Sequence, residues 1–180
     1  MESGNIKKIA IIGAESTGKT ALCEQLALHF NTVWVPEFAR EYFNNSDIYN
    51  YTLEDLEHIA IKQVELEEKL SKRANTLLFC DTALITLKIW AELEFGTCPE
   101  SIKRFMKSNP YDYYLITNND VAWEPDPQRL NKFPREQIFE MNREAALLEK
   151  VPFGIVLGAG DLRILNAKEH LRTFQNKQSL

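Results

Sequence analysis

Short apolar runs alternate along the chain with longer segments in which apolar residues recur at helical spacing. Short runs of this kind are typical of strands buried on both faces, and the amphipathic segments are typical of helices that cover a sheet. The pattern predicts strands over residues 9–12, 32–35, 76–81, 112–117 and 153–157. Helices are expected over residues 19–30, 52–73, 82–95, 99–107, 135–150 and 161–174.

The order of these elements predicts the fold class. Strands and helices alternate from the first strand to the last helix, which favours a three-layer α/β sandwich with a parallel sheet of about five strands. The 180 residues suit one domain with a sizeable core, and no linker, repeat or low-complexity segment divides them. We therefore expect a single domain over residues 1–180.

Composition narrows the class of partner. Hydrophobic residues make up 44% of the chain and charged residues 26%, as in ordinary globular proteins. The net charge of -5 argues against a nucleic-acid-binding surface, which is usually basic, so a small-molecule partner is expected. No apolar run approaches the ~20 residues of a membrane span, and no secretory signal is recognisable. Three cysteines without metal-ligand spacing fit a reducing cytoplasm, and the oligomeric state stays open.

The first apolar run leads directly into a glycine-rich turn. Residues 13–20 match G-x-x-x-x-G-K-[ST], the phosphate-binding loop, at every fixed position. Its glycines allow left-handed turns that point backbone N–H groups at a polyphosphate, which predicts ATP binding. Lys19 is expected to reach the β- and γ-phosphates, and the Thr20 hydroxyl to ligate Mg²⁺. The residues expected to hold the nucleotide are Gly13, Glu15, Ser16, Thr17, Gly18, Lys19 and Thr20.

An acidic residue follows the second predicted strand. Glu37 comes directly after the proline that ends this strand, at the sheet edge where ligands of open α/β sheets bind. It is a candidate general base or ligand of a substrate hydroxyl; alternatively, it is an acid that complements the dipole of the next helix. Arg40, one helical turn on, could pair with Glu37 or contact phosphate, and the alternative is a surface ion pair.

A second acid ends the third predicted strand. Asp81 closes an apolar run, as does the carboxylate that holds Mg²⁺ in other proteins with a phosphate-binding loop. The same residue also suits the N-cap of the following helix, and the two roles are compatible. Thr20 and Asp81 are therefore the predicted metal ligands.

The segment after the fourth predicted strand is expected to form a lid loop around residues 118–136. It combines proline, acids, arginines and a tryptophan without periodicity. Trp123 could stack on an aromatic base, and Asp126 could accept hydrogen bonds from sugar hydroxyls. Arg129 and Arg135 could close over a transferring phosphate. The alternative is a solvated loop with incidental charges.

Proteins with phosphate-binding loops include both switches and kinases. A GTPase requires a lysine where Asn118 stands, before its guanine-reading aspartate, and a glycine where Leu84 stands, so both of these signals are absent. A small-molecule kinase requires an acid for the substrate hydroxyl, a magnesium site and an arginine-bearing lid. The sequence offers Glu37, Thr20 with Asp81, and Arg129 with Arg135. A kinase explains more of the residues, and its candidate catalytic residues are Lys19, Glu37, Asp81 and Arg129.

Five segments together carry a resemblance to a known family. They read G-A-E-S-T-G-K-T, P-E-F-A-R-E-Y, a strand that ends in D-T, W-A-E-L-E-F-G and N-N-D-V-A-W-E-P-D-P-Q-R. Over roughly residues 8–157 the chain resembles the ribosylnicotinamide kinase domain of NadR-type NAD-biosynthesis proteins. The resemblance implies a P-loop nucleoside-kinase fold and ATP-dependent phosphorylation of the 5′-hydroxyl of nicotinamide riboside to nicotinamide mononucleotide. The alternatives are a kinase of another nucleoside or small metabolite, and an ATP-binding regulatory or sensor module.

The resemblance also implies roles for single residues. Trp123 would stack on the nicotinamide, and Asp126 would bind the ribose. Glu37 and Asp81 would hold the acceptor hydroxyl and the metal ion, in an order that stays open.

The chain departs from the family pattern in two places. Ala83 stands where the family often has a second acid, and Pro127 replaces a lid glycine, which is expected to stiffen the loop and to shift Arg129. Full-length relatives also carry a DNA-binding region and an adenylyltransferase domain before this one. Residues 1–8 leave no room for either, so neither activity is expected.

Overall fold

The computed structural model describes residues 6–130 and 132–178, and in that part of the chain it contains one five-stranded sheet. All neighbouring strands are parallel, in the order β2-β3-β1-β4-β5. The strands are β1 (Lys7–Gly13), β2 (Trp34–Val35), β3 (Leu77–Asp81), β4 (Tyr113–Thr117) and β5 (Phe153–Val156). The predicted α/β fold with a five-stranded parallel sheet is confirmed.

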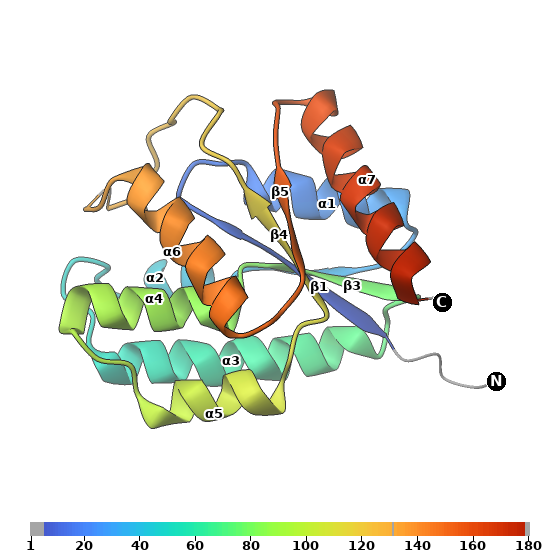
Figure 1. Ribbon diagram of the computed structural model, residues 1–180. Helices are drawn as coiled ribbons and strands as arrows, with labels where there is room; N and C mark the ends of the chain where they lie inside the picture. The colour runs from blue at the N-terminus through green and yellow to red at the C-terminus, as the bar shows by residue number, and fades with distance from the viewer. Residues whose placement is uncertain (1–5, 131, 179–180) are drawn as a thin grey trace.

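Helices cover both faces of the sheet and make a three-layer sandwich (Figure 1). One face carries α1 (Lys19–His29) and α7 (Asp161–Gln178), and the other carries α3 (Leu53–Ser71), α4 (Leu84–Phe95) and α6 (Arg135–Leu148). The short helix α2 (Phe38–Phe43) packs on α3, and α5 (Glu100–Ser108) packs on the outside of α3 and α4. None of these helices combines the length and the apolar character needed to cross a bilayer.

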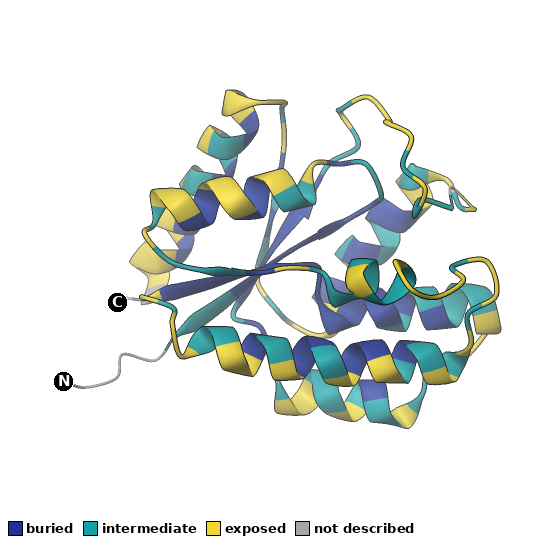
Figure 2. Cartoon of the chain, turned by 180° about the vertical axis from the view of Figure 1, so that it is seen from behind, coloured by how far each residue is buried: buried dark blue, intermediate teal, exposed yellow. Residues whose placement is uncertain are grey.

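Alternation along β1 supplies both halves of the core. Ile9 and Ile11 pack with α1 and α7, whereas Ala10 and Ile12 pack with residues of α4 and α6. Successive side chains of a strand point to opposite faces, so a run that is apolar at every position can bury both. Figure 2 shows the result: the strands are mostly buried, and the helices are exposed mainly on the sides that face away from the sheet.

Some element boundaries differ from those predicted. α4 begins at Leu84 rather than at Thr82, because the backbone of Thr82 takes a left-handed conformation (φ 76°) that a right-handed helix does not contain. β2 is shorter than predicted and covers Trp34 and Val35; before it, the Thr32 hydroxyl donates to the Leu77 carbonyl (2.6 Å). α7 continues to Gln178, four residues past its predicted end.

The topology gathers four connections at one edge of the sheet. β1 lies between β3 and β4, and β3 lies between β1 and β2. Because all strands are parallel, the loops after β1, β2, β3 and β4 start from the same edge. These are the loops that carry the phosphate-binding motif, Glu37, Asp81 and the lid.

Candidate active site

The phosphate-binding loop is shaped by backbone conformations that few residues tolerate. Gly13 has a φ of 136°, and a Cβ atom there would lie 2.5 Å from the Thr117 Oγ1 atom, so only glycine fits. Ser16 and Gly18 are also left-handed, with φ of 56° and 75°. The Thr17 hydroxyl donates to the Ala14 carbonyl (2.8 Å) and lies 2.6 Å from the Thr117 hydroxyl. The last residue of β4, Thr117, therefore packs against the phosphate-binding loop and stabilises its conformation.

Lys19 is folded back over its own loop. Its Nζ atom donates to the carbonyl oxygens of Gly13 (3.2 Å) and Ala14 (2.8 Å). Burial lowers the pKa of Lys19, and the nearby carboxylates of Glu37 and Asp81 oppose this shift. The ammonium group thus lies within the cradle where a phosphate chain would replace the carbonyls as its partner.

Thr20 and Asp81 meet as predicted for a metal site. The Thr20 hydroxyl donates to Asp81 Oδ2 at 2.5 Å, and Asp81 is 1% exposed. Asp81 Oδ1 is buried without a hydrogen-bond partner. Burial raises the pKa of Asp81, against the effects of Lys19 and of the Thr20 hydrogen bond. An unpaired carboxylate oxygen beside a hydroxyl is a donor set that suits Mg²⁺.

Mg²⁺ needs few ligands from a protein. Among the described residues, no group of three or more histidines, cysteines or acids is placed to hold a metal ion. Mg²⁺ in nucleotide sites characteristically takes only one or two protein oxygens and completes its octahedron with phosphates and water. Thr20 and Asp81 offer two such oxygens.

Glu37 follows β2 and takes the N-cap position of α2, yet its side chain makes no capping hydrogen bond. Its Oε2 atom lies 3.4 Å from Arg40 Nε. Burial and the neighbouring Asp81 raise the pKa of Glu37, while Lys19 and Arg40 lower it. A carboxyl group with a raised pKa near a lysine and a metal site has the properties of a general base.

Asp126 ties the lid to α2. Its Oδ2 atom accepts a hydrogen bond from Arg40 Nη1 (3.1 Å) and lies 3.7 Å from Arg129 Nη2. Pro127 takes the second position of a turn that the Arg129 N–H closes onto the Asp126 carbonyl (3.0 Å), a position that proline favours. Gln128 donates to the Arg40 carbonyl (3.1 Å). The lid tip is therefore docked on α2.

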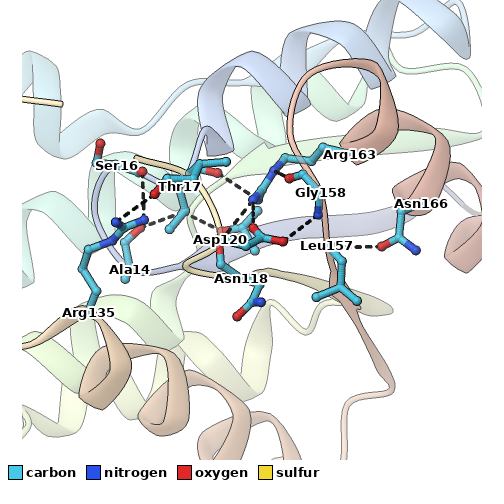
Figure 3. A network of polar contacts seen from close by, with 12 residues as sticks. Ala14, Ser16, Thr17, Asn118, Asp120, Arg135, Leu157, Gly158, Arg163 and Asn166 are labelled. Atoms are coloured by element: carbon cyan, nitrogen blue, oxygen red, sulfur yellow. Dashed lines mark hydrogen bonds and ion pairs between the residues drawn. The ribbon is translucent and has the colours of Figure 1, made fainter. Parts of the chain in front are cut away.

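The other end of the lid is tied to Ser16 of the phosphate-binding loop. The Ser16 hydroxyl accepts hydrogen bonds from the Glu124 N–H (2.8 Å) and from Arg129 Nη1 (3.4 Å). Arg135 donates to the Ser16 carbonyl (3.2 Å) and to the Val121 carbonyl (3.0 Å), as Figure 3 shows in part. Arg135, expected to close over phosphate, is here engaged with backbone carbonyls.

A first cavity brings most of the candidate residues together. It is partly open to solvent, and its space for water-sized molecules is about 120 Å³. Its walls come from the phosphate-binding loop, α2, α3, α4 and the lid, and include Gly13, Ser16, Lys19, Glu37, Arg40, Thr82, Thr86, Trp90 and Arg129. Glu37 and Arg129 thus lie on the same side of the molecule as the phosphate cradle.

Two of the chain's tryptophans are placed differently. Trp90 of α4 lines the first cavity. Trp123, a candidate for base stacking, is 39% exposed and is not among the residues that line this cavity or the second one. Sequence reasoning missed Trp90 because a cavity-lining face of a helix is as apolar as a core face.

A second cavity lies across the phosphate-binding loop from the first. Its lining includes Ser16, Gly18, Gln25, Ala122, Gly160 and Arg163. Ser16 and Arg129 line both cavities. The loop therefore separates two spaces, either of which could take part of an elongated ligand that lies along it.

Arg163 of α7 lines the second cavity and is bonded to the phosphate-binding loop (Figure 3). It is 5% exposed and donates to the carbonyl oxygens of Gly158 (2.7 Å), Thr17 (3.0 Å) and Asn118 (3.3 Å). It also pairs with the Asp120 carboxylate. No motif marks this residue in the sequence; the only signal was the glycine-rich turn before α7.

A comparison with protein families identifies the chain. A family model described as an AAA domain, AAA_28, matches residues 8–162. The chain belongs to the AAA_28 family. The match contains every site residue predicted from the sequence and ends one residue before Arg163.

Relatives of this AAA_28 chain include two trifunctional NAD biosynthesis/regulator proteins, NadR of Salmonella typhimurium and NadR of Escherichia coli. Each is 27% identical over 127 residues, which is 69% of this chain and 31% of the relative. The match thus spans about a third of the length of these curated relatives. The predicted resemblance to NadR-type proteins is confirmed.

Solved structures confirm the fold of this AAA_28 chain. A NadR protein in complex with NR has a TM-score of 0.80 at 19% identity and covers 94% of this chain and 50% of its own. A NadR protein with NAD and AMP-PNP has a TM-score of 0.77 at 20% identity, with 95% and 50% covered. Thymidylate kinase from Candida albicans has a TM-score of 0.57 at 11% identity, with 96% and 92% covered. The fold is that of P-loop kinases.

Proposed function

We propose that this chain is an ATP-dependent kinase that phosphorylates the 5′-hydroxyl of nicotinamide riboside, giving nicotinamide mononucleotide and ADP. One observation carries the proposal: Lys19, Glu37 and Arg129 line a single cavity, directly beside the Thr20–Asp81 pair. Phosphoryl transfer to an alcohol requires a phosphate-binding loop, a metal ion, a general base and a cationic side chain on a lid.

In this proposal ATP lies along the phosphate-binding loop, with its base in the second cavity and its γ-phosphate at the first. Backbone N–H groups of the loop and Lys19 hold the phosphate chain, which gives Lys19 a new partner in place of the Gly13 and Ala14 carbonyls. Mg²⁺, held by Thr20 and Asp81, would neutralise charge on the β- and γ-phosphates. The nucleoside occupies the first cavity.

The transfer step assigns a role to each side chain. The acceptor oxygen attacks the γ-phosphorus, the bond from this phosphorus to the bridging oxygen breaks, and ADP leaves. Glu37 receives the hydroxyl proton, which its raised pKa favours. Arg40 and Arg129 stabilise the charge on the transferring group. Asp126, now paired with both arginines, is proposed to bind the ribose hydroxyls once the substrate engages these cations.

Three relatives support the choice of substrate. The Salmonella typhimurium NadR protein is named for NAD biosynthesis, and NadR proteins have been crystallised with NR, with NAD and with AMP-PNP. These ligands belong to those proteins. They make nicotinamide riboside the first acceptor to test here, and ATP the first phosphoryl donor.

A panel of nucleosides tests the proposal. ADP release from ATP and Mg²⁺ is measured without acceptor and with nicotinamide riboside, thymidine, cytidine, uridine or adenosine. The expected result is release that depends on nicotinamide riboside, with nicotinamide mononucleotide as the product. Faster turnover with another nucleoside would replace the substrate but keep the kinase, whereas acceptor-independent hydrolysis would overturn both.

One observation favours a second candidate, an ATP-binding sensor without transferase activity. The lid is bonded at both ends, to Ser16 and to α2, and Pro127 stiffens its turn. A lid that stays closed would bind nucleotide without admitting an acceptor. Tight ATP binding without product from any nucleoside would support this candidate.

A further inference from the structure

The Asp120 carboxylate is turned away from the second cavity, although its neighbours in sequence line it. Asp120 is the third residue after β4, where GTPases carry the aspartate that reads guanine. Val121 and Ala122 line the second cavity, but Asp120 is not among the lining residues. Its Oδ2 atom accepts a hydrogen bond from the Gly158 N–H (2.6 Å), and its Oδ1 atom pairs with Arg163.

Arg163 is fixed in the position that engages Asp120. Its guanidinium group also donates three hydrogen bonds to backbone carbonyls, which orient this planar fork. In the described part of the chain, Arg163 is the only cation that forms an ion pair with Asp120. The charge of Asp120 is therefore compensated by one buried residue.

If this carboxylate were unpaired and faced the cavity, it would discriminate between guanine and adenine. Guanine presents two adjacent donors, N1–H and the 2-amino group, which a carboxylate can accept together. Adenine presents a lone pair on N1 and a C–H group at C2, so an ionised carboxylate at this position repels it. An aspartate at this edge favours guanine when its carboxylate is free to bond the base. It has no effect on base selection when its carboxylate is paired with a cation.

We propose that Arg163 is a specificity-determining positioning residue, which withholds the Asp120 carboxylate from the second cavity and so makes that cavity select adenine over guanine nucleotides. The proposal rests on the placement of the nucleotide base in the second cavity. It explains why a chain with an aspartate at the guanine-reading position uses ATP. Arg163 acts through Asp120 and contacts neither the phosphates nor the acceptor.

Nucleotide binding tests this inference without any acceptor nucleoside. Dissociation constants for ATP and GTP are measured with Mg²⁺ by displacement of a fluorescent ATP analogue. The main variant is Arg163→Gln, which removes the charge but keeps an amide donor for the backbone carbonyls. Arg172→Gln is the matched control, since Arg172 lies on the same helix, is 71% exposed and pairs only with Glu169 among the bonds observed for it.

The readout is the ratio of the GTP to the ATP dissociation constant. In Arg163→Gln we expect this ratio to fall about tenfold, the worth of one charge-assisted pair of hydrogen bonds. In Arg163→Gln/Asp120→Asn the ratio should return to the wild-type value, because the neutral amide no longer favours guanine. Arg172→Gln should leave it unchanged.

Three results would overturn the inference. One is equal weakening of ATP and GTP in Arg163→Gln, which is what a merely structural role predicts. Another is a shifted ratio that persists in the double variant. If Arg163→Gln does not fold, Asp120→Asn alone decides, since a change of the ratio there would mean that the carboxylate already contacts the base. A wild-type chain that binds neither nucleotide would instead contradict the proposed function.

Discussion

The two sides of the phosphate-binding loop differ in how completely their buried polar groups are bonded. On the side of the second cavity, Arg163 donates to three carbonyls and pairs with Asp120. On the side of the first cavity, several lining residues of the described chain carry a buried side-chain atom without a hydrogen-bond partner. They are Tyr51 (Oη), Thr82 (Oγ1) and Thr86 (Oγ1), and Asp81 (Oδ1) lies beside them; Arg129 (Nε), which lines both cavities, also lacks a partner.

This difference separates a framework from a binding surface. Buried polar groups in proteins nearly always have partners, and leaving one unpaired costs roughly 1–3 kcal/mol. The first cavity holds a set of such groups, so a ligand that bonds to them recovers this free energy on binding. Among the described residues that line the second cavity, only Arg129 has such a group, and Arg129 lines the first cavity as well. We therefore expect substitutions at the first cavity to lower activity more than stability, and those at Arg163 to lower stability.

Lys19→Ala should lower turnover more than any other substitution considered, and it tests the phosphate-binding loop between the two cavities. In the part of the chain that the structure describes, Lys19 donates hydrogen bonds to carbonyls of its own loop, and we expect it to meet developing negative charge. We expect turnover to fall by about 10³-fold or more, with the melting temperature nearly unchanged. Lys62→Ala, an exposed lysine paired with Glu65, is the control. Retention of most of the turnover would contradict the assignment.

Asp81→Asn should separate activity from stability. Burial raises the pKa of Asp81, so the folded state binds its proton more tightly than the unfolded state does. Stability is therefore lost as the pH rises from the ordinary aspartate pKa through the raised one, and at pH 7 a neutral amide relieves this cost. We expect turnover to fall by about 10²-fold or more through loss of the metal ligand, with equal or higher resistance to urea.

Asp47→Asn is the control for that prediction because the pKa of Asp47 is shifted in the opposite direction, downward. Hydrogen bonds from Asn50 and from the Tyr49 backbone lower the pKa of Asp47, so its ionised form favours the folded state at pH 7. This variant should lose a little stability and no activity. An Asp81→Asn chain that unfolds more readily than wild type would show that Asp81 is part of the framework.

The parts of the site that sequence predicted are those fixed by neighbours in the chain or in the sheet. The phosphate-binding loop is local, and Gly13 and Gly18 have the left-handed backbones that its glycines imply. Thr20 and Asp81 follow adjacent strands, so strand order alone brings them together. The capping box of Thr52 and Asp55 at the start of α3 is likewise local.

The parts that sequence did not predict depend on bonds to the backbone across long separations. Arg163 donates to a carbonyl 146 residues away, and every residue has a carbonyl, so no side-chain pattern marks the partner. The same holds for Arg135 and the Ser16 carbonyl. Whether Trp90 faces a core or a cavity is decided by the elements packed opposite it.

Glu37→Gln tests the base of the first cavity through pH. Because burial and Asp81 raise the pKa of Glu37, the acidic limb of kcat/KM against pH should lie above that of an ordinary glutamate. Activity requires the ionised form, so it falls as the pH drops through this raised pKa. In Glu37→Gln we expect kcat to be lower by about 10²-fold, the limb to be absent and ATP affinity to be little changed.

Glu41→Gln, on the same short helix, is the control and should keep the wild-type profile. The direction of the pKa shift also predicts the stability of Glu37→Gln. Because the pKa of Glu37 is raised, its charged form disfavours folding, so the neutral variant should be at least as stable as wild type at pH 7. An unaltered kcat would move the base role to Asp81.

The two tryptophans give the smallest expected effect and show whether the first cavity has the same shape when substrate is bound. Trp90 lines the cavity and contacts Phe133 edge-on, with ring centroids 6.5 Å apart, whereas Trp123 is outside it. If the base stacks in the cavity as it stands, Trp90→Ala should raise the nucleoside KM by about tenfold and leave the ATP KM nearly unchanged. Trp123→Ala should raise the nucleoside KM by less than about threefold.

The reverse order of these effects would be equally informative. Trp123 carries the stacking role that the family resemblance implies, and it can meet a base in the first cavity only if the lid leaves its bonds to Ser16. A larger effect of Trp123→Ala would therefore mean that substrate binding rearranges the lid. Ser16→Ala, which removes the hydroxyl that holds the lid, should then lower the nucleoside KM in the wild-type background, whereas a fixed lid predicts no such gain.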